Sequence, residues 1–343
     1  MHPVTSTPGL RMLFLRTLSL CLLSNLFAPF VSAQGLLLVA NKGDQTLGII
    51  DPVAGRQIGA VPEDGLTGHE VAASRDGRFA FVPIYGSGGV GGPGTDGSLL
   101  RVIDVAKRAI VGTVDFGKGV RPHCAVVGPK NGLLYVTTEL DNSVTVIDPT
   151  TLKIIGTIPT GQAESHMLAI TSDGRRGYTA NVKSGTVSVL DLEAGKLLKV
   201  ISVSTRVQRI ALSADDRWVY TSDQNQPRLA VIDTKTNEVA SWIALPALAF
   251  ATAVTPDGRW LLAVMTHQNQ IAVVDLATKQ VVHTLDLPKA PQEALVRPDG
   301  LVAYVSCDAT KQIAVVDLKT WTVPQLIPAG RTADGLAWAR TQK

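Results

Sequence analysis

The chain has 343 residues, of which 45% are hydrophobic and 18% charged, with 32 Lys and Arg against 29 Asp and Glu. This composition excludes a disordered chain, which would be less hydrophobic and more strongly charged, and a collagen-like chain. The formal charge of +3 argues against a protein that binds nucleic acid through a basic surface. A globular protein is therefore expected.

The N-terminal segment is typical of a secretory signal peptide. Arg11 and Arg16 precede an apolar run from Leu18 to Val31, and small residues lead to Ala33. The run has 14 residues, whereas a membrane-spanning helix needs about 20, which argues against a retained anchor. We expect a signal peptide over residues 1–33 and a mature chain of residues 34–343, periplasmic or secreted, with charge +3 − 2 = +1 and no membrane span.

A repeat of about 42 residues organises the mature chain. Two apolar residues followed by Asp recur seven times, at spacings of 53, 44, 43, 42, 42 and 42 residues. The aspartates are Asp51, Asp104, Asp148, Asp191, Asp233, Asp275 and Asp317. The long first spacing contains a glycine-rich insertion, residues 86–97, which we call the insertion loop.

Six units also carry an Asp-Gly, Asn-Gly or Asp-Asp pair between short β-rich runs, which predicts a hairpin with both central residues at positive φ. Four short strands per period are typical of a β-propeller blade. Residues 36–61 lack a first strand and residues 334–340 supply a spare one, so both termini should share a blade. The sequence predicts an all-β, seven-bladed propeller of four-stranded antiparallel blades, as one domain.

The chain resembles the YVTN-type β-propeller repeat proteins. Matching stretches are YVTTE at 135–139, YTAN at 178–181, YTSD at 220–223 and VTPDG at 254–258, besides the Val-Ile-Asp motifs. The resemblance implies the same propeller fold over nearly all of residues 35–340. Lactonase-type hydrolases and surface-layer-type proteins with similar propellers make a hydrolase one implied function.

One repeat position is rich in histidine. Seven residues before the turn Asp, with one inserted residue in one unit, the position holds His69, His123, His166, Gln208, Phe250, Gln292 and Asp334. Here each first strand begins, which should place these side chains at one mouth of the central channel. The neighbouring Glu70, Arg121, Glu164 and Arg209 complete the predicted ligand-binding rim.

Three chemistries are open to this rim. His69, His123 and His166 are candidate ligands for Zn or Cu, because neutral imidazoles bind these metals. A His or Glu could instead act as general acid or base, with Arg121 or Arg209 stabilising an oxyanion. The imidazoles could also be structural lining. Cys124 and Cys307 lie in blades far apart and are expected to be buried free thiols.

The favoured function is a binding module that presents the rim to a small-molecule ligand or a periplasmic protein. The alternatives are a lactonase-like hydrolase and a metal-binding or redox accessory protein. Whether the chain is an enzyme stays open, and we expect a monomer.

Overall fold

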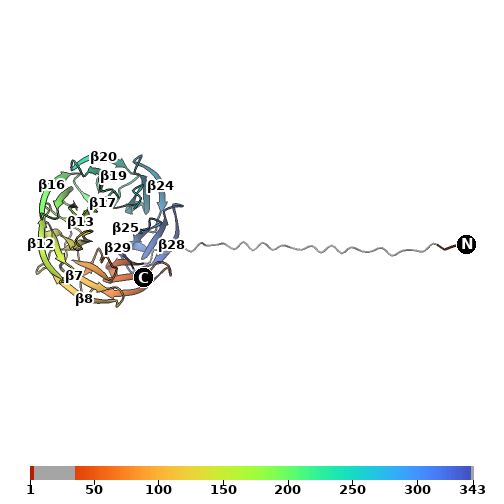
Figure 1. Ribbon diagram of the computed structural model, residues 1–343, viewed down its shortest axis with the longest axis horizontal. Helices are drawn as coiled ribbons and strands as arrows, with labels where there is room; N and C mark the ends of the chain where they lie inside the picture. Colours follow the sequence, from red (N-terminus) through yellow and green to blue (C-terminus); the bar gives the residue numbers. More distant parts are fainter. Residues whose placement is uncertain (4–34, 341–343) are drawn as a thin grey trace. The chain divides into compact units, whose positions relative to one another are not determined.

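Seven antiparallel sheets stand around a central channel in the computed structural model, which describes residues 1–3 and 35–340 (Figure 1). Six of these sheets have four strands, and the sheet of blade 2 has five because its first strand is split. The predicted signal peptide falls almost wholly on residues outside the described part. In the described residues, no helix has the length and apolar character needed to cross a membrane. The predicted all-β, seven-bladed propeller is confirmed.

The blades follow the chain order, except that blade 1 combines both ends of the ring. Blade 1 contains β29 (Ala333–Arg340), β1 (Gly35–Asn41), β2 (Thr46–Asp51) and β3 (Arg56–Pro62), and blade 2 contains β4 (Thr67–Gly68), β5 (Ala72–Ala73), β6 (Phe79–Gly86), β7 (Asp96–Asp104) and β8 (Ala109–Asp115). Blade 3 contains β9 (Pro122–Val127), β10 (Leu134–Thr138), β11 (Ser143–Asp148) and β12 (Lys153–Pro159), and blade 4 contains β13 (Ser165–Ile170), β14 (Arg176–Asn181), β15 (Thr186–Asp191) and β16 (Lys196–Ser202). Blade 5 contains β17 (Val207–Leu212), β18 (Trp218–Asp223), β19 (Arg228–Asp233) and β20 (Glu238–Ala244), and blade 6 contains β21 (Ala251–Val254), β22 (Trp260–Met265), β23 (Gln270–Asp275) and β24 (Gln280–Asp286). Blade 7 contains β25 (Pro291–Val296), β26 (Val302–Cys307), β27 (Gln312–Asp317) and β28 (Thr322–Pro328).

The first strand of each blade lies toward the channel and the fourth lies at the outer edge, as β17 and β20 show in Figure 1. The ring closes as predicted, because β29 pairs antiparallel with β1 in a register that sets Gly35 opposite Arg340 and Leu37 opposite Trp338. Closure removes the unpaired edges that the first and last strands would otherwise expose inside the ring.

The second strand in four blades runs into a single 3-10 turn before the third. These turns are η1 (Lys42–Asp44), η2 (Glu139–Asp141), η3 (Thr266–Gln268) and η4 (Asp308–Thr310). Because the first strands begin where the second strands end, these turns and the starts of the first strands share one face of the ring. We call this the rim face.

The turns on the opposite face differ from the prediction in backbone geometry. Gly77, Gly132, Gly174, Gly258 and Gly300, and Asp216 in blade 5, have positive φ, whereas the Asp or Asn before each of them does not. In blade 2, Gly77 N–H donates to Ser74 O, and Asp76 Oδ1 accepts from Ser74 Oγ and from Arg78 N–H. These side-chain bonds hold the aspartate in the ordinary turn conformation, so only the following residue needs the left-handed region.

All seven Val-Ile-Asp aspartates brace the turn that follows them, as expected for Asp at such a place. Asp51 Oδ1, for example, accepts the backbone N–H groups of Val53 at 2.9 Å and Ala54 at 3.0 Å. Corresponding bonds occur at Asp104, Asp148, Asp191, Asp233, Asp275 and Asp317.

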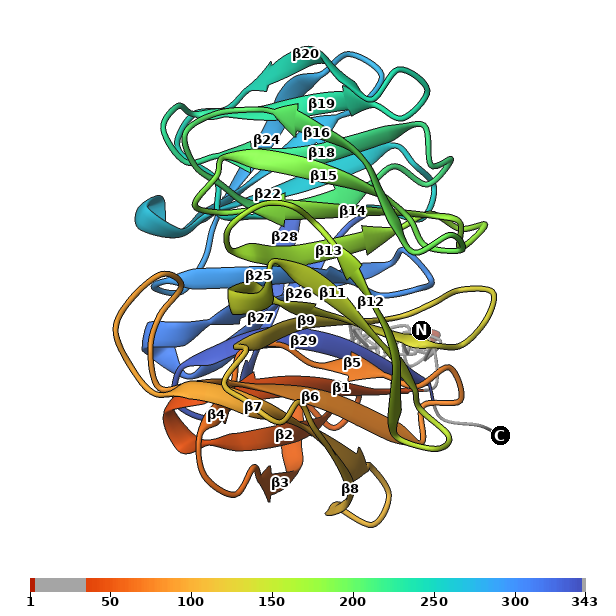
Figure 2. The ribbon, with the colours of Figure 1, turned by 90° about the vertical axis from the view of Figure 1, so that its left-hand side faces the viewer.

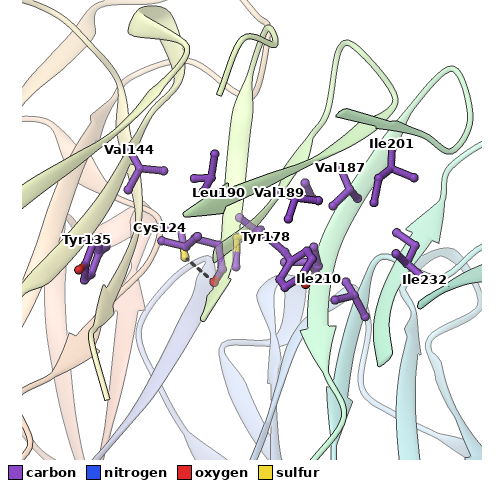
Figure 3. Close-up of a cluster of buried hydrophobic side chains, with 14 of the residues drawn as sticks. Cys124, Tyr135, Val144, Tyr178, Val187, Val189, Leu190, Ile201, Ile210 and Ile232 are labelled. Atoms are coloured by element: carbon purple, nitrogen blue, oxygen red, sulfur yellow. Dashed lines mark hydrogen bonds between the residues drawn. The ribbon is translucent and has the colours of Figure 1, made fainter. Parts of the chain in front are cut away.

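The core consists of apolar side chains packed between neighbouring blades. Figure 3 shows one such cluster across blades 3, 4 and 5, in which Tyr135, Tyr178 and Ile210 are buried. Cys124 belongs to it, with its Sγ 3.9 Å from Leu168 O. Cys124 and Cys307 are both free and buried, as predicted.

Candidate functional site

β-Bulges at the start of the first strands place the candidate residues in the channel. The ladder between first and second strands skips a register near His123 in blade 3, His166 in blade 4 and Arg209 in blade 5. It does so again at Gln292 and Glu293 in blade 7. A bulge leaves residues outside the ladder and redirects their side chains, which is how these blades turn polar groups inward.

Imidazole and phenol rings from blades 2, 3 and 4 pack together beneath the rim face. The His123 and His166 ring centroids are 3.6 Å apart, and His69 stacks on Tyr85 at 4.3 Å. His69 and Tyr85 each meet His123 edge-on, at 5.6 and 5.3 Å. The predicted convergence of the three histidines is therefore present, as a stack of rings.

Glu139 joins this stack through hydrogen bonds. It is 1% exposed, and its Oε1 lies 2.5 Å from His166 Nδ1. Its Oε2 accepts the hydroxyl proton of Tyr85 at 2.7 Å. A carboxylate on Nδ1 fixes the orientation of an imidazole, so Glu139 positions His166.

The other half of the cluster is an ion network around Arg209. From blade 5, the guanidinium lies 2.7 Å from Glu70, 3.2 Å from Asp334 and 3.4 Å from Glu293. These carboxylates belong to blades 2, 1 and 7, so Arg209 spans the channel. Lys42 adds a second cation, with Nζ 2.8 Å from Asp334.

Burial perturbs the ionisable groups of this cluster. It lowers the pKa of His69 to about 3, with Lys42 adding to the effect, and lowers the pKa of His123 well below its ordinary value. It also raises the pKa of Glu70 and of Glu293. Burial is the largest cause for both carboxyls, and Arg209 opposes it, so the neutral form of Glu70 and of Glu293 is favoured relative to an exposed glutamate.

Asp334 and Lys42 behave in the opposite way. Burial favours the neutral form of Asp334, but Lys42 and Arg209 outweigh it and lower the pKa of Asp334. Burial also disfavours the charged form of Lys42, and Asp334 reverses this, so the pKa of Lys42 is raised. This pair therefore stays ionised.

Blade 2 departs most from the repeat at its first strand, which the sequence predicts as continuous. It is split into β4 and β5, and both segments pair with β6. Between them, the His69 carbonyl accepts the N–H of Gly335 from blade 1 at 2.9 Å. A Cβ on Gly335 would lie 2.5 Å from His69 O and 2.6 Å from Glu70 Cα, so this close approach requires glycine.

The insertion loop lies on the rim face, as predicted, and is drawn at the left in Figure 2, between β6 and β7. Arg121 holds it: Nε is 2.5 Å from Asp96, and Nη2 donates to Gly92 O at 2.9 Å. The predicted rim residue Arg121 thus anchors the loop. Further along, Gly91 abuts the Glu164 side chain in blade 4.

An open cavity of about 310 Å³ lies between this loop and the channel cluster. Lys42, Thr67 and His69 line one side, and Gly86, Ser87, Gly88 and Gly89 of the insertion loop line the other. Such a volume is at the lower end of the range for small-molecule sites. Among the three clustered histidines, His69 is the one that lines this cavity.

The remaining predicted residues are distributed unevenly around the rim. Gln208 is buried beside Arg209, and within the described residues its Oε1 has no partner. Gln292 is half-buried and donates to Ala290 O at 3.4 Å. Glu164 lines a separate cavity of about 310 Å³ with Lys183 and Arg206.

The predicted metal ligands do not form a metal site in this arrangement. In residues 35–340, no group of three or more His, Cys, Asp or Glu side chains is disposed to hold a metal ion. The His123 and His166 ring planes are tilted by 32°, the His69 ring meets His123 edge-on, and Nδ1 of His166 faces Glu139.

Tyr85, Glu293 and Lys42 were missed as rim residues. Glu293 occupies the repeat position of Glu70 and Arg209, one residue after the histidine position, so the repeat alignment contained that signal. Lys42, like Glu139, follows the last residue of a second strand.

Comparisons with known proteins agree on the architecture. The Cytochrome D1 heme domain family matches residues 128–249, which is 122 of 343 residues and runs from the turn after β9 in blade 3 to the loop before β21 in blade 6. No curated protein matches the chain. Kuenenia stuttgartiensis hydrazine synthase is similar in structure, with a TM-score of 0.70 and 15% identity over 82% of this chain and 92% of that chain. A functionally unknown protein from Desulfotomaculum acetoxidans has a TM-score of 0.74 and 12% identity over 90% of this chain and 99% of that chain. At these identities the likeness shows the fold alone.

Proposed function

We propose that this protein is an exported YVTN-type β-propeller that binds a small polar ligand at its rim face. The observation that carries the proposal is the concentration of buried ionisable groups at one end of the channel. Arg209, Glu70, Glu139 and Asp334 are each 5% exposed or less, and burying charges costs free energy that apolar side chains would not. Perturbed groups gathered beside a cavity are typical of functional sites.

The cavity indicates the kind of ligand. Its polar lining consists of a neutral His69 imidazole, the Lys42 ammonium group and the hydroxyls of Thr67, Ser87 and Thr332. These groups suit a compact molecule rich in oxygen atoms. The insertion loop supplies a glycine-rich wall over this molecule, and Arg121 fixes the far end of that wall.

Thermal unfolding of the mature protein with small hydroxy acids, lactones and sugar acids tests the proposal. A ligand at 100 times its Kd should add about 2.7 kcal/mol to the stability. The Thr67→Val variant changes one hydroxyl in the cavity and should lose that stabilisation. A ligand that stabilises both proteins equally, or a panel that stabilises neither, would count against rim binding.

Export has its own test. N-terminal sequencing of the protein from the periplasmic fraction should begin at Gln34, and size-exclusion chromatography should show a monomer. Protein that retains residues 1–33 in a membrane fraction would contradict the signal-peptide prediction.

Heme is suggested by the name of the matched family, but the residues present do not fit it. The cavity beside His69 is walled by glycines and small polar residues, and in its described lining there is no large apolar side chain to cover a porphyrin face. The channel beneath is filled by the Arg209 network. We therefore derive no heme chemistry for this chain.

Hydrolysis of a lactone or related ester is the second candidate function, and the Glu139–His166 pair favours it. A carboxylate-oriented imidazole is a familiar general base for activating water. His166→Gln and Glu139→Gln should then abolish turnover of a lactone panel while the unfolding temperature changes little. Unchanged turnover in both variants would leave ligand binding as the function.

A further inference from the structure

A second kind of cavity lies away from the rim, on the flank where blades 2 and 3 meet. It has a volume of about 640 Å³ and is bordered by the turn of residues 74–76, which belongs to the face opposite the rim. We call it the flank groove. Its apolar wall consists of Phe79, Phe81, Val102, Val111, Val127 and Leu152.

Cationic side chains edge this apolar wall. Arg78 and Lys107 are the most exposed of them, with side chains 58% and 65% exposed. Arg78 Nε and Lys107 Nζ lie 3.5 and 3.7 Å from Oδ2 of the buried Asp104, which are long distances for ion pairs. Arg75 donates to Gly128 O and so ties blade 2 to blade 3 at the end of the groove. With Asp76 included, three cations face two carboxylates, a net charge of +1.

The repeat provides an internal comparison. An equivalent groove of about 600 Å³ lies between blades 5 and 6 and is lined by Trp218, Tyr220 and Lys279. Arg217 there takes the place of Arg78, two residues after the turn aspartate, and it makes a close two-bond pair with Asp233. Its charge is therefore satisfied within the blade, in contrast to that of Arg78.

The two grooves also differ in the residues at two equivalent repeat positions. Lys107 lies three residues after its Val-Ile-Asp aspartate, where blade 5 has Thr236. Leu152 lies four residues after its aspartate, where blade 6 has Lys279, whose Nζ donates to Ser241 at 2.8 Å. The flank groove thus carries one excess positive charge along its apolar wall, whereas in the equivalent groove Arg259 and Lys279 are matched in number by Asp215 and Asp257.

From this combination we infer that the flank groove is a second binding site, for a small amphiphilic anion with an aromatic or branched apolar body and one carboxylate or sulfonate group. The body lies against Phe79, Phe81 and Leu152, and the anionic group lies between Arg78 and Lys107. A cation–π contact orients the Arg78 guanidinium beside the groove, because its Cζ lies 4.7 Å from the centroid of the Phe79 ring. Such a site is independent of the rim.

Anilinonaphthalene sulfonate, a fluorescent anion with an aromatic body, is the probe. Saturable binding is expected in the wild type, and the Arg78→Gln/Lys107→Gln double variant should weaken it by roughly tenfold. The neutral N-phenylnaphthylamine has a similar body without the charge, and its affinity should be the same in both proteins. The matched control, Arg259→Gln/Lys279→Gln, removes two cations from the equivalent groove and should leave sulfonate binding unchanged.

A second variant, which fills the groove with a larger side chain, tests the site without removing its charges. Val111 is 47% exposed, so Val111→Trp can occupy the groove without disturbing the core, and it should weaken both probes. The inference is overturned if the sulfonate shows no saturable binding, if it binds Arg78→Gln/Lys107→Gln as tightly as the wild type, or if Val111→Trp leaves both probes unaffected.

Discussion

A buried carboxylate outside both sites makes the stability of the ring depend on pH. Glu63 follows β3 and is fully buried. Its Oε2 accepts the N–H of Gly68 at 2.8 Å, and among the described residues Oε1 has no hydrogen-bond partner. Burial raises the pKa of Glu63 from 4.5 to about 7, against the opposing effect of the Gly68 hydrogen bond.

The magnitude follows from the linkage between protonation and folding. Between pH 4.5 and pH 7 the folded chain retains a proton that the unfolded chain has lost, so stability falls as the pH rises. The pKa difference of 7 − 4.5 corresponds to about 3 kcal/mol at 1.36 kcal/mol per unit. That stability is fully present below pH 4.5 and is lost once the pH has risen through 7.

The Glu63→Gln variant removes the titration and preserves the shape. Urea unfolding at a series of pH values from about 4.5 to 8 should show the variant gaining about 3 kcal/mol relative to the wild type across that interval. Glu193→Gln changes an exposed glutamate and serves as the control, with no pH-dependent gain. A constant difference between Glu63→Gln and the wild type at every pH would refute the assigned burial of this charge.

Three further changes test the channel cluster. Gly335→Ala should destabilise the ring by about 2 kcal/mol or more in thermal unfolding, because its Cβ meets His69 O, and unchanged stability would contradict that close approach. Arg209→Met should cost about 3–5 kcal/mol in urea unfolding, with less loss at pH 5 than at pH 8, because burial already raises the pKa of Glu70 and the unpaired carboxylate can take up a proton at the lower pH; an equal loss at both pH values would contradict this effect of burial on Glu70. His123→Phe should stabilise the protein by about 1 kcal/mol, since within the described residues His123 Nδ1 has no partner; destabilisation would show that this imidazole serves the fold.

The propeller architecture could be predicted because each blade repeats the same short sequence motifs, and each motif determines a local turn or strand. Each Val-Ile-Asp aspartate bonds to backbone groups two or three residues away, so its role is contained in a short window such as 148–151. The closing strand could be placed because the chain has a spare first strand at one end and a missing one at the other. These features need no knowledge of side-chain packing.

The site was only partly predictable, because its contacts cross blades. The repeat position placed His69, His123 and His166 together, but it could not show that His69 meets His123 edge-on or that the His123 and His166 rings pack at a tilt. Arg121 illustrates the same limit. Its neighbours along the chain place it at the rim, and its actual partner, Asp96, comes from a loop 25 residues earlier.

The Arg209 network links the candidate site to the closure of the ring. Asp334 lies on β29, the C-terminal strand that completes blade 1, and Arg209 reaches it from blade 5 across the channel. Glu293 accepts the N–H of Leu336 on the same strand at 2.7 Å. The groups that shape the rim are therefore the groups that hold the last strand against the neighbouring blade. Burying these charges costs free energy. The pairing of β29 with β1 and the apolar contacts of blade 1 stabilise the closed ring and offset that cost. A propeller closed in this way can keep a polar, ionised cluster at one end of its channel because the rest of the ring is apolar and fully paired.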